Sequence, residues 1–411
     1  MSHQRNPLPA SFRRLAWSNL LAQAAEQIGL AAAPLVAVLA LHAGPGATGW
    51  LQTAQTLPFL LIAIPAGLLA DRMQRRRLMA GAEAMRAASL LLVLALATLG
   101  GLSLPLLALL GFVGACGTVV YGVAAPALVP TLVEREQLPT ANARIELART
   151  VAYAGGPALA GLLAGITGAA PAFAFAAALS AAAVVLLAGL REPARGDITP
   201  ASGNAIDDLR EGTRFVFGHA LLRPIFLTQV IFAVAFFVLH SVYVPYAVHQ
   251  LGLPAFAVGA TLAAYGGGMV AGALAAPRLM RLLPLGVMVA IGPLAGLAAA
   301  ALMACTLLFA SAWLAGLSYF LMGAGPILWV ISTTTLRQNV TPQRLLGRAS
   351  AINSLSYGAR PIGAALGALI GGSLGAGACL IASVIFFGVQ AGVILLSPAV
   401  RLREQPAPAG A

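Results

Sequence analysis

Apolar runs of about 20 residues recur along the whole chain, and each is long enough to cross a hydrocarbon core about 30 Å thick as one helix. Hydrophobic residues make up 60% of the 411 residues and charged residues only 9%, which is more apolar surface than a soluble protein of this size can bury. Backbone groups inside lipid must be satisfied within their own segment, so the runs are predicted to be helices. The chain is therefore expected to be an all-α membrane protein.

Twelve such helices are predicted, separated by breaks that are rich in glycine and proline. They are expected to begin near Leu15, Gly49, Leu78, Leu104, Asn142, Ala172, Ile225, Ala255, Leu285, Trp313, Leu345 and Ala378. The first helix follows Arg13 and Arg14, as a signal peptide would follow its basic region. This helix is too long for a signal peptide and carries Glu26 near its middle, so it is interpreted as an uncleaved transmembrane helix.

The charged residues predict the orientation of these helices. All 24 basic residues are arginine, and all but Arg86, Arg149 and Arg360 lie in the tails or in alternate connections. Those connections are residues 71–77, 134–144, 191–223, 278–281 and 337–348. Cytoplasmic connections carry the excess of arginine. Both termini are therefore expected in the cytoplasm of a bacterial cell, with the chain in the plasma (inner) membrane. Topology and anionic lipid headgroups account for the net charge of +12, so no nucleic acid partner is expected.

A weak internal repeat divides the chain. Arg144, Tyr153 and Pro157 recur at the same spacing as Arg348, Tyr357 and Pro361, which makes the fifth and eleventh predicted helices counterparts. The repeat predicts two pseudo-symmetric six-helix halves, residues 1–190 and 224–411, joined by a cytoplasmic linker at residues 191–223. Transporters with two such halves bind their substrates near the middle of the membrane.

The segment from Gly67 to Arg77 connects the second and third predicted helices. Its order resembles the signature loop of the major facilitator superfamily, G-x-L-x-D-R-x-G-R-R, with Gln74 in place of one glycine. The residues that fit are Gly67, Leu69, Asp71, Arg72, Arg75 and Arg76. This resemblance implies a transporter of the major facilitator fold that works by alternating access. It also implies that Gly67, Asp71, Arg72, Arg75 and Arg76 form a gate on the cytoplasmic side.

A second motif bears on the direction of transport. Residues 155–161 resemble the G-P-x-x-G-G motif of the fifth helix in facilitator antiporters that export drugs, and Gly156, Pro157 and Gly161 match it. The alternative is ordinary helix packing through small residues. Residues 126–133 and 335–342 also resemble the cytoplasmic elbows of the branch that contains macrolide efflux proteins and the enterobactin exporter.

Polar side chains inside the predicted helices mark a candidate cavity for protons and substrate, because such residues are costly in lipid. Asn19, Gln23, Glu26 and Gln27 share one face of the first helix, with Glu26 about 16 Å along it. This polar stripe is expected to face a wet cavity, where Glu26 would exchange protons or bind cations. The alternative is a glutamate that is hydrogen-bonded in helix packing.

The eleventh helix offers a second stripe, Asn353, Tyr357 and Arg360, in which Arg360 either holds an anionic substrate group or locks two helices together. The other candidates for the cavity are Gln52, Gln55, Gln229, His240 and Tyr243. Two charged pairs at i, i+3 spacing, Glu83–Arg86 and Glu146–Arg149, are interpreted as structural ion pairs near the membrane interface or as parts of a gating network.

The chain lacks the motifs of the common enzyme classes. Cys116, Cys305 and Cys379 are too far apart in sequence to suggest a metal site or a disulfide framework, and a phosphate-binding loop requires the lysine that this chain lacks. No cofactor is expected. The sequence predicts a monomeric secondary transporter that exports a small amphiphilic compound, such as a drug or siderophore, in exchange for H+. The alternatives are an importer, a lysolipid flippase on the same fold, and a membrane sensor that transports nothing.

Overall fold

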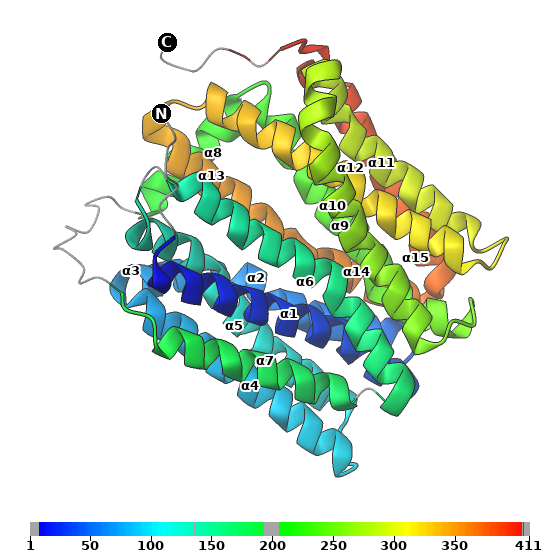
Figure 1. Ribbon diagram of the computed structural model, residues 1–411. Coiled ribbons are helices and arrows are strands. Elements are labelled where there is room, and N and C mark those ends of the chain that lie inside the picture. Colours follow the sequence, from blue (N-terminus) through cyan, green and yellow to red (C-terminus); the bar gives the residue numbers. More distant parts are fainter. Residues whose placement is uncertain (1–7, 135–136, 169, 193–204, 405, 407–411) are drawn as a thin grey trace. The chain divides into compact units, whose positions relative to one another are not determined.

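The computed structural model describes residues 8–134, 137–168, 170–192, 205–404 and 406, and all regular structure in those ranges is helical. Figure 1 shows the helices and their labels. They are α1 (Ala10–Leu39), α2 (Pro45–Leu61), α3 (Ala63–Arg72), α4 (Arg75–Thr98), α5 (Leu104–Leu132), α6 (Leu138–Thr167), α7 (Ala170–Ala188), α8 (Ala205–Gly218), α9 (Leu222–His249), α10 (Ala255–Leu282), α11 (Leu285–Cys305), α12 (Ala312–Val340), α13 (Leu346–Leu355), α14 (Arg360–Ser373) and α15 (Ala376–Leu395). Short 3-10 turns lie at Gln343–Leu345, Ser356–Ala359 and Pro398–Arg401.

The predicted all-α architecture is confirmed, and the structure is roughly consistent with the predicted count of twelve membrane-spanning segments. Within the described residues, nine helices are long and apolar enough to cross a membrane: α1, α4, α5, α7, α9, α10, α11, α12 and α15. The other three predicted spans correspond to the α2–α3 pair, the path from α13 to α14, and α6. Helix α6 has the length, but charged residues in its first half and glycines in its second lower its hydropathy.

Prolines explain why two of the spans are broken. Pro65 has no N–H for the carbonyl of Leu61, and its ring clashes with that carbonyl in a continuous helix, so α2 ends there and α3 begins at Ala63. Pro361 acts in the same way on Tyr357, which lies in the 3-10 turn before α14. The second and eleventh helices, predicted as continuous, are therefore each made of two helices. Pro157 aligns with Pro361 in the repeat, yet α6 continues through it.

The chain forms two compact units. The first comprises Met1–Leu41 and Ala54–Ile198, and the second comprises His42–Thr53 and Thr199–Ala411. The first part of α2 belongs to the second unit because it packs closely on α14: a Cβ atom on Gly49 would lie 2.4 Å from Ala368 Cα. The predicted bounds of the halves and linker stay a prediction. The predicted linker contains α8 and the first residues of α9.

In the first unit, α1 packs against α6 and α7, and α4 packs against α5 and α7. Large side chains such as Phe12, Leu15, Tyr121 and Leu187 fill the space between these helices and are fully or almost fully buried. In the second unit, α12 packs on α10 and α11, while α9 packs on α14 and α15. A Cβ atom on Gly268 would lie 2.0 Å from the carbonyl oxygen of Phe320, so glycine lets α10 and α12 touch through their backbones.

Helix α8 is amphipathic and packs on α13 within the second unit. An ion pair joins Glu211 of α8 to Arg348 of α13. Gly212 allows this contact, because a Cβ atom there would lie 3.1 Å from the Arg348 carbonyl oxygen. Arg348, one of the arginines of the sequence repeat, therefore holds the connecting helix to the first part of the broken eleventh span.

Candidate functional site

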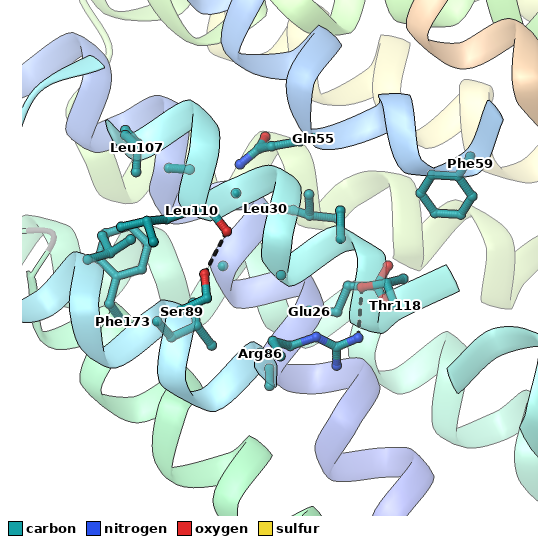
Figure 2. A pocket seen from close by; sticks show the side chains of 18 residues that line it. Glu26, Leu30, Gln55, Phe59, Arg86, Ser89, Leu107, Leu110, Thr118 and Phe173 are labelled. Carbon is teal, nitrogen blue, oxygen red and sulfur yellow. Dashed lines mark hydrogen bonds between the residues drawn. The ribbon is translucent and has the colours of Figure 1, made fainter. Parts of the chain in front are cut away.

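A pocket lies inside the first unit, between α1, the end of α2, α4, α5 and α7 (Figure 2). It is partly open, and the cavity volume available to the centre of a water-sized sphere is about 70 Å³. Most of its lining is apolar. The polar side chains that line it are Glu26, Gln55, Arg86, Ser89 and Thr118.

Arg86 is the fixed positive charge of this pocket. Its Nη1 atom lies 2.7 Å from Oε1 of Glu83 and donates a hydrogen bond of 3.0 Å to the carbonyl oxygen of Ala22. Its Nη2 atom donates to the Thr118 hydroxyl at 2.7 Å. Because arginine stays protonated in proteins, these contacts from α1, α4 and α5 hold a permanent cation in place.

Glu83 completes the ion pair, and its Oε2 atom accepts a hydrogen bond of 3.0 Å from the Ser180 hydroxyl of α7. The predicted Glu83–Arg86 pair is confirmed, and its predicted position near the membrane interface stays a prediction. The side chains of Glu83 and Arg86 are 0% and 5% exposed, so neither reaches out of the bundle. The predicted Glu146–Arg149 pair is also confirmed, and it is much more exposed, at 53% and 35%.

Glu26 lines the pocket from α1 and is half-buried. Figure 2 shows its side chain on the same side of the pocket as Arg86 and Thr118. The formal charges of Glu83 and Arg86 cancel each other. The protonation state of Glu26 therefore decides whether this part of the pocket is neutral or carries a net negative charge.

Gln55 lies on the opposite side of the pocket from Arg86 in Figure 2. Its side chain is 4% exposed, and its Oε1 atom is buried without a hydrogen-bond partner among the described residues. Gly111 of α5 makes room for it, since a Cβ atom there would lie 2.9 Å from Gln55 Cγ. Ser89, by contrast, is already engaged, because its hydroxyl donates to the Leu110 carbonyl oxygen at 2.6 Å.

The rest of the polar stripe on α1 does not line this pocket. Asn19 is buried and donates a hydrogen bond of 3.3 Å to the carbonyl oxygen of Ile145 in α6. Gln27 is buried against Gly156 of α6, where a Cβ atom on the glycine would lie 2.4 Å from Gln27 Cβ. Gln23 is half-buried. Two of the four residues thus pack between α1 and α6, and Glu26 is the member of the stripe that lines the pocket.

Two candidates in the second unit, His240 and Tyr243, lie in an aromatic cluster. His240 Nδ1 is 3.2 Å from the Tyr319 hydroxyl, and the His240 ring stacks on Phe236 with 5.1 Å between centroids. The Tyr243 hydroxyl bonds to Thr261, and the Tyr243 ring meets that of Tyr319 edge to face.

Two residues of the predicted stripe on the eleventh span, Tyr357 and Arg360, contact each other. The guanidinium of Arg360 lies 4.5 Å from the centroid of the Tyr357 ring, a cation–π contact. Asn353 and Gln229 are half-buried, and Gln52 is buried in the part of α2 that belongs to the second unit.

The connection predicted at residues 71–77 is shorter than expected, because most of the facilitator-like motif is helical. Helix α3 runs to Arg72 and α4 starts at Arg75, so Met73 and Gln74 alone connect them. Gly67 lies inside α3 with open space around it. Arg72 is exposed, and the side chain of Asp71 lies outside the described residues.

Arg75 and Arg76 have structural partners in the first unit. Arg75 Nη1 donates to the Ala127 carbonyl oxygen at 2.7 Å, and Arg76 Nη1 donates to that of Ala188 at 2.9 Å, at the end of α7. Glu192 Oε2 accepts from the Arg76 backbone N–H at 3.1 Å. A carboxylate thereby satisfies an unpaired donor at the start of α4, and an arginine satisfies a carbonyl at the end of α7. Through these contacts Arg75 and Arg76 hold the start of α4 to α5 and α7. The role of the two arginines in gating stays a prediction.

The antiporter-like motif lies in α6, where Gly156, Pro157 and Gly161 are all buried. The contact between Gly156 and Gln27 accounts for that glycine by helix packing, and a role in antiport stays a prediction. Arg86, Ser89 and Thr118 are pocket residues that the predicted cavity did not include. The one signal in the sequence that pointed to Arg86 was its charge within an apolar helix.

Comparisons with known proteins agree with this architecture. The model of the family described as transmembrane secretion effector matches residues 6–408. The structure resembles a mutant of the nucleoside transporter NupG (TM-score 0.74, 13% identity, covering 94% of this chain and 98% of that one). It also resembles a POT family transporter in complex with 5-aminolevulinic acid (TM-score 0.74, 14% identity, covering 95% of this chain and 97% of that one). A third similar structure is a bacterial homologue of the human lysosomal transporter Spinster, inward-facing and unoccupied (TM-score 0.70, 16% identity, covering 98% of this chain and 100% of that one).

At these identities the likeness to solved structures concerns the fold alone, and no curated protein sequence gives a significant match. The family match, by contrast, extends over nearly the whole chain. The chain therefore belongs to the transmembrane secretion effector family and is a membrane transporter with the major facilitator fold.

Proposed function

We propose that this transporter exports a small amphiphilic compound, such as a drug or siderophore, in exchange for protons by alternating access. The observation that carries the proposal is the pocket in which Glu26 lies on the same side as the fixed cation Arg86 (Figure 2). The description of the family as a secretion effector supports the outward direction. The apolar lining of the pocket, which includes Phe59 and Phe173, supports a substrate with an apolar body.

Protonation of Glu26 is the step that couples the proton to the substrate. Glu83 balances Arg86, so an ionised Glu26 gives the pocket a net negative charge. That charge attracts a cationic or hydrogen-bond-donating group of the substrate, and the attraction is strong where water is scarce. Binding of a proton to Glu26 removes the charge and weakens the attraction. A proton that enters from outside thus favours release of the substrate there.

The orientation in the membrane follows from the arginines. We place both termini in the cytoplasm of a bacterial cell, with the protein in the plasma membrane, because the tails and alternate connections hold nearly all the arginines. In this orientation the residues around Asp71–Arg77 lie on the cytoplasmic side, where they would gate the inward-open state. The protein would work as a monomer in contact with membrane lipids.

Transport by purified protein in liposomes tests the direction of coupling. The vesicles enclose the pH dye pyranine, and the substrates offered are ethidium, a macrolide and a catecholate siderophore. Proton exchange predicts that a substrate accumulates in vesicles that are acidic inside, and that its entry raises the internal pH.

The rival functions predict other results. Accumulation that requires acid outside the vesicle would support an importer driven by protons. Movement of a fluorescent lysolipid without any gradient would support a flippase. Equilibration of every substrate without a change in internal pH would overturn proton coupling.

A further inference from the structure

We propose that four arginines at the corner between α10 and α11 form a binding site for the phosphate group of an anionic phospholipid. Arg278 and Arg281 belong to α10, and Arg401 and Arg403 belong to the C-terminal segment. All four side chains are exposed, and we call these four residues the basic corner. It is a site for a membrane lipid and not for the transported compound, so it does not depend on the direction or the coupling of transport.

The C-terminal segment is held against the start of α11, and this brings the two pairs of arginines together. The Gly286 backbone N–H donates to the carbonyl oxygen of Leu402 at 2.7 Å, and the Leu285 N–H donates to that of Arg403 at 3.2 Å. The Leu402 side chain packs on the buried cluster that contains Leu285. The segment therefore satisfies N–H groups that a helix start leaves free, and it places Arg401 and Arg403 beside the short connection from α10 to α11.

The basic corner lies at the end of a membrane-spanning helix. Both α10 and α11 are long and apolar enough to cross a membrane. Leu274 of α10 is 76% exposed, and Arg278 and Arg281 follow it on the same face of the helix, one and two turns further on. A leucine so exposed on a membrane-spanning helix meets acyl chains. The arginines that follow it, in the last turns of α10, are therefore at the level of the lipid headgroups.

The charges of the basic corner are not balanced by the protein. Residues 222–403 include no aspartate or glutamate, and Glu404 is the one acidic side chain that follows them. No ion pair or hydrogen bond joins any of the four guanidinium groups to another residue in the part of the chain that the structure describes. Arg348 of the same unit, by contrast, is paired with Glu211. Four arginines thus stand against a single carboxylate, and the corner attracts anions.

The chemistry of the corner fits a phospholipid better than a soluble anion. A guanidinium group can donate two parallel hydrogen bonds to the oxygens of a phosphate. Leu274 and Leu282, which are 76% and 69% exposed, lie beside the arginines and offer apolar contacts to acyl chains. A free phosphate would leave these contacts unused. A zwitterionic lipid would bring a cationic amine towards the arginines, so the expected ligand is a phospholipid with a net negative headgroup.

Native mass spectrometry of the whole protein in detergent, titrated with phosphatidylglycerol, measures the affinity of the first lipid bound. One arginine near an anionic lipid surface strengthens binding by a factor of roughly five. We therefore expect the double variant Arg401→Gln with Arg403→Gln to weaken the binding of phosphatidylglycerol about 25-fold. The native protein should bind phosphatidylethanolamine, which is zwitterionic, more weakly than phosphatidylglycerol.

Two exposed arginines of α8, Arg210 and Arg214, provide the matched control for loss of charge. Arg210→Gln with Arg214→Gln removes the same charge from a helix that is not a candidate membrane span, so it should leave the affinity unchanged.

A glycine variant tests whether the position of the C-terminal segment matters. A Cβ atom on Gly286 would overlap the carbonyl oxygen of Val400, so Gly286→Val should displace the segment and weaken lipid binding as the Arg401 and Arg403 double variant does. Gly388 has open space around it, and Gly388→Val should bind the lipid normally.

Several outcomes would overturn the inference. Equal losses for the two pairs of arginines would assign the binding to total charge, and unchanged binding by Arg401→Gln with Arg403→Gln would remove the site altogether. Equal binding of phosphatidylglycerol and phosphatidylethanolamine would exclude a site for anionic headgroups. Displacement of the lipid by glycerol 3-phosphate at equal concentration would make the corner a site for soluble phosphate esters. The arginine variants change only exposed side chains, so they decide the question even where Gly286→Val fails to fold.

Discussion

The ion pair between Glu83 and Arg86 predicts a large loss of stability when one partner is removed. Arg86→Met deletes the cation that lies 2.7 Å from Glu83 and two hydrogen bonds, to Ala22 and Thr118. The Glu83 side chain is 0% exposed and keeps only its bond to Ser180 at 3.0 Å. Breaking a buried pair in this way typically costs 3–5 kcal/mol, so we expect a loss of about 4 kcal/mol in the free energy of unfolding.

Two further variants separate the charge effect from a loss of packing. The double variant Glu83→Leu with Arg86→Met removes both charges, and it should recover most of the lost stability. Arg149→Met breaks a pair of the same type and spacing, but with side chains that are 35% and 53% exposed. An exposed pair is worth at most about 1 kcal/mol, so this variant should lose no more than that.

The assay is reversible unfolding in mixed micelles, with the free energy of unfolding obtained from titration with denaturing detergent. The difference between the double variant and the sum of the single variants Arg86→Met and Glu83→Leu gives the coupling energy of the pair. Equal losses for Arg86→Met and Arg149→Met would refute the reasoning. A double variant as unstable as that sum would refute it as well.

Three further predictions follow. Gly268→Ala should lower the free energy of unfolding by about 1–3 kcal/mol through overpacking against α12, measured as above, whereas Gly267→Ala, with open space around residue 267, should not lower it. Reporter fusions after Gly196 and after Gly252 should score on opposite membrane faces, and equal scores would refute the proposed topology. Asp71→Asn should insert normally yet transport poorly, with a shift towards the inward-open state seen in cysteine labelling; unchanged transport and labelling would leave the motif without a role in gating.

The helices could be predicted from the sequence because twelve apolar segments of sufficient length leave the backbone few alternatives in lipid. The breaks at Leu61 and Tyr357 were not predicted. Proline is not sufficient for such a break, since Pro157 lies inside the continuous helix α6 while its counterpart Pro361 ends a helical segment. Tertiary packing decides whether a helix breaks at its proline or continues through it, and one sequence does not reveal that packing.

The candidate site was predictable in part for a similar reason. Glu26 and Gln55 stood out as polar residues in apolar helices, and both line the pocket. Asn19 and Gln27 stood out equally, but a polar face does not identify the neighbour that it meets, and here that neighbour is α6. The role of Arg86 was missed because Glu83 on the same helix seemed to complete its contacts.

Transport by Glu26 variants tests the central claim, that Glu26 carries the exchanged proton. The variants are reconstituted in vesicles that are acidic inside, and the accumulation of a substrate that the native protein transports is measured. Glu26→Gln should abolish accumulation and keep substrate exchange without a gradient, because glutamine mimics the protonated acid. Glu26→Asp should accumulate partially, and the matched control Glu146→Gln fully. Full gradient-driven accumulation by Glu26→Gln would contradict the account.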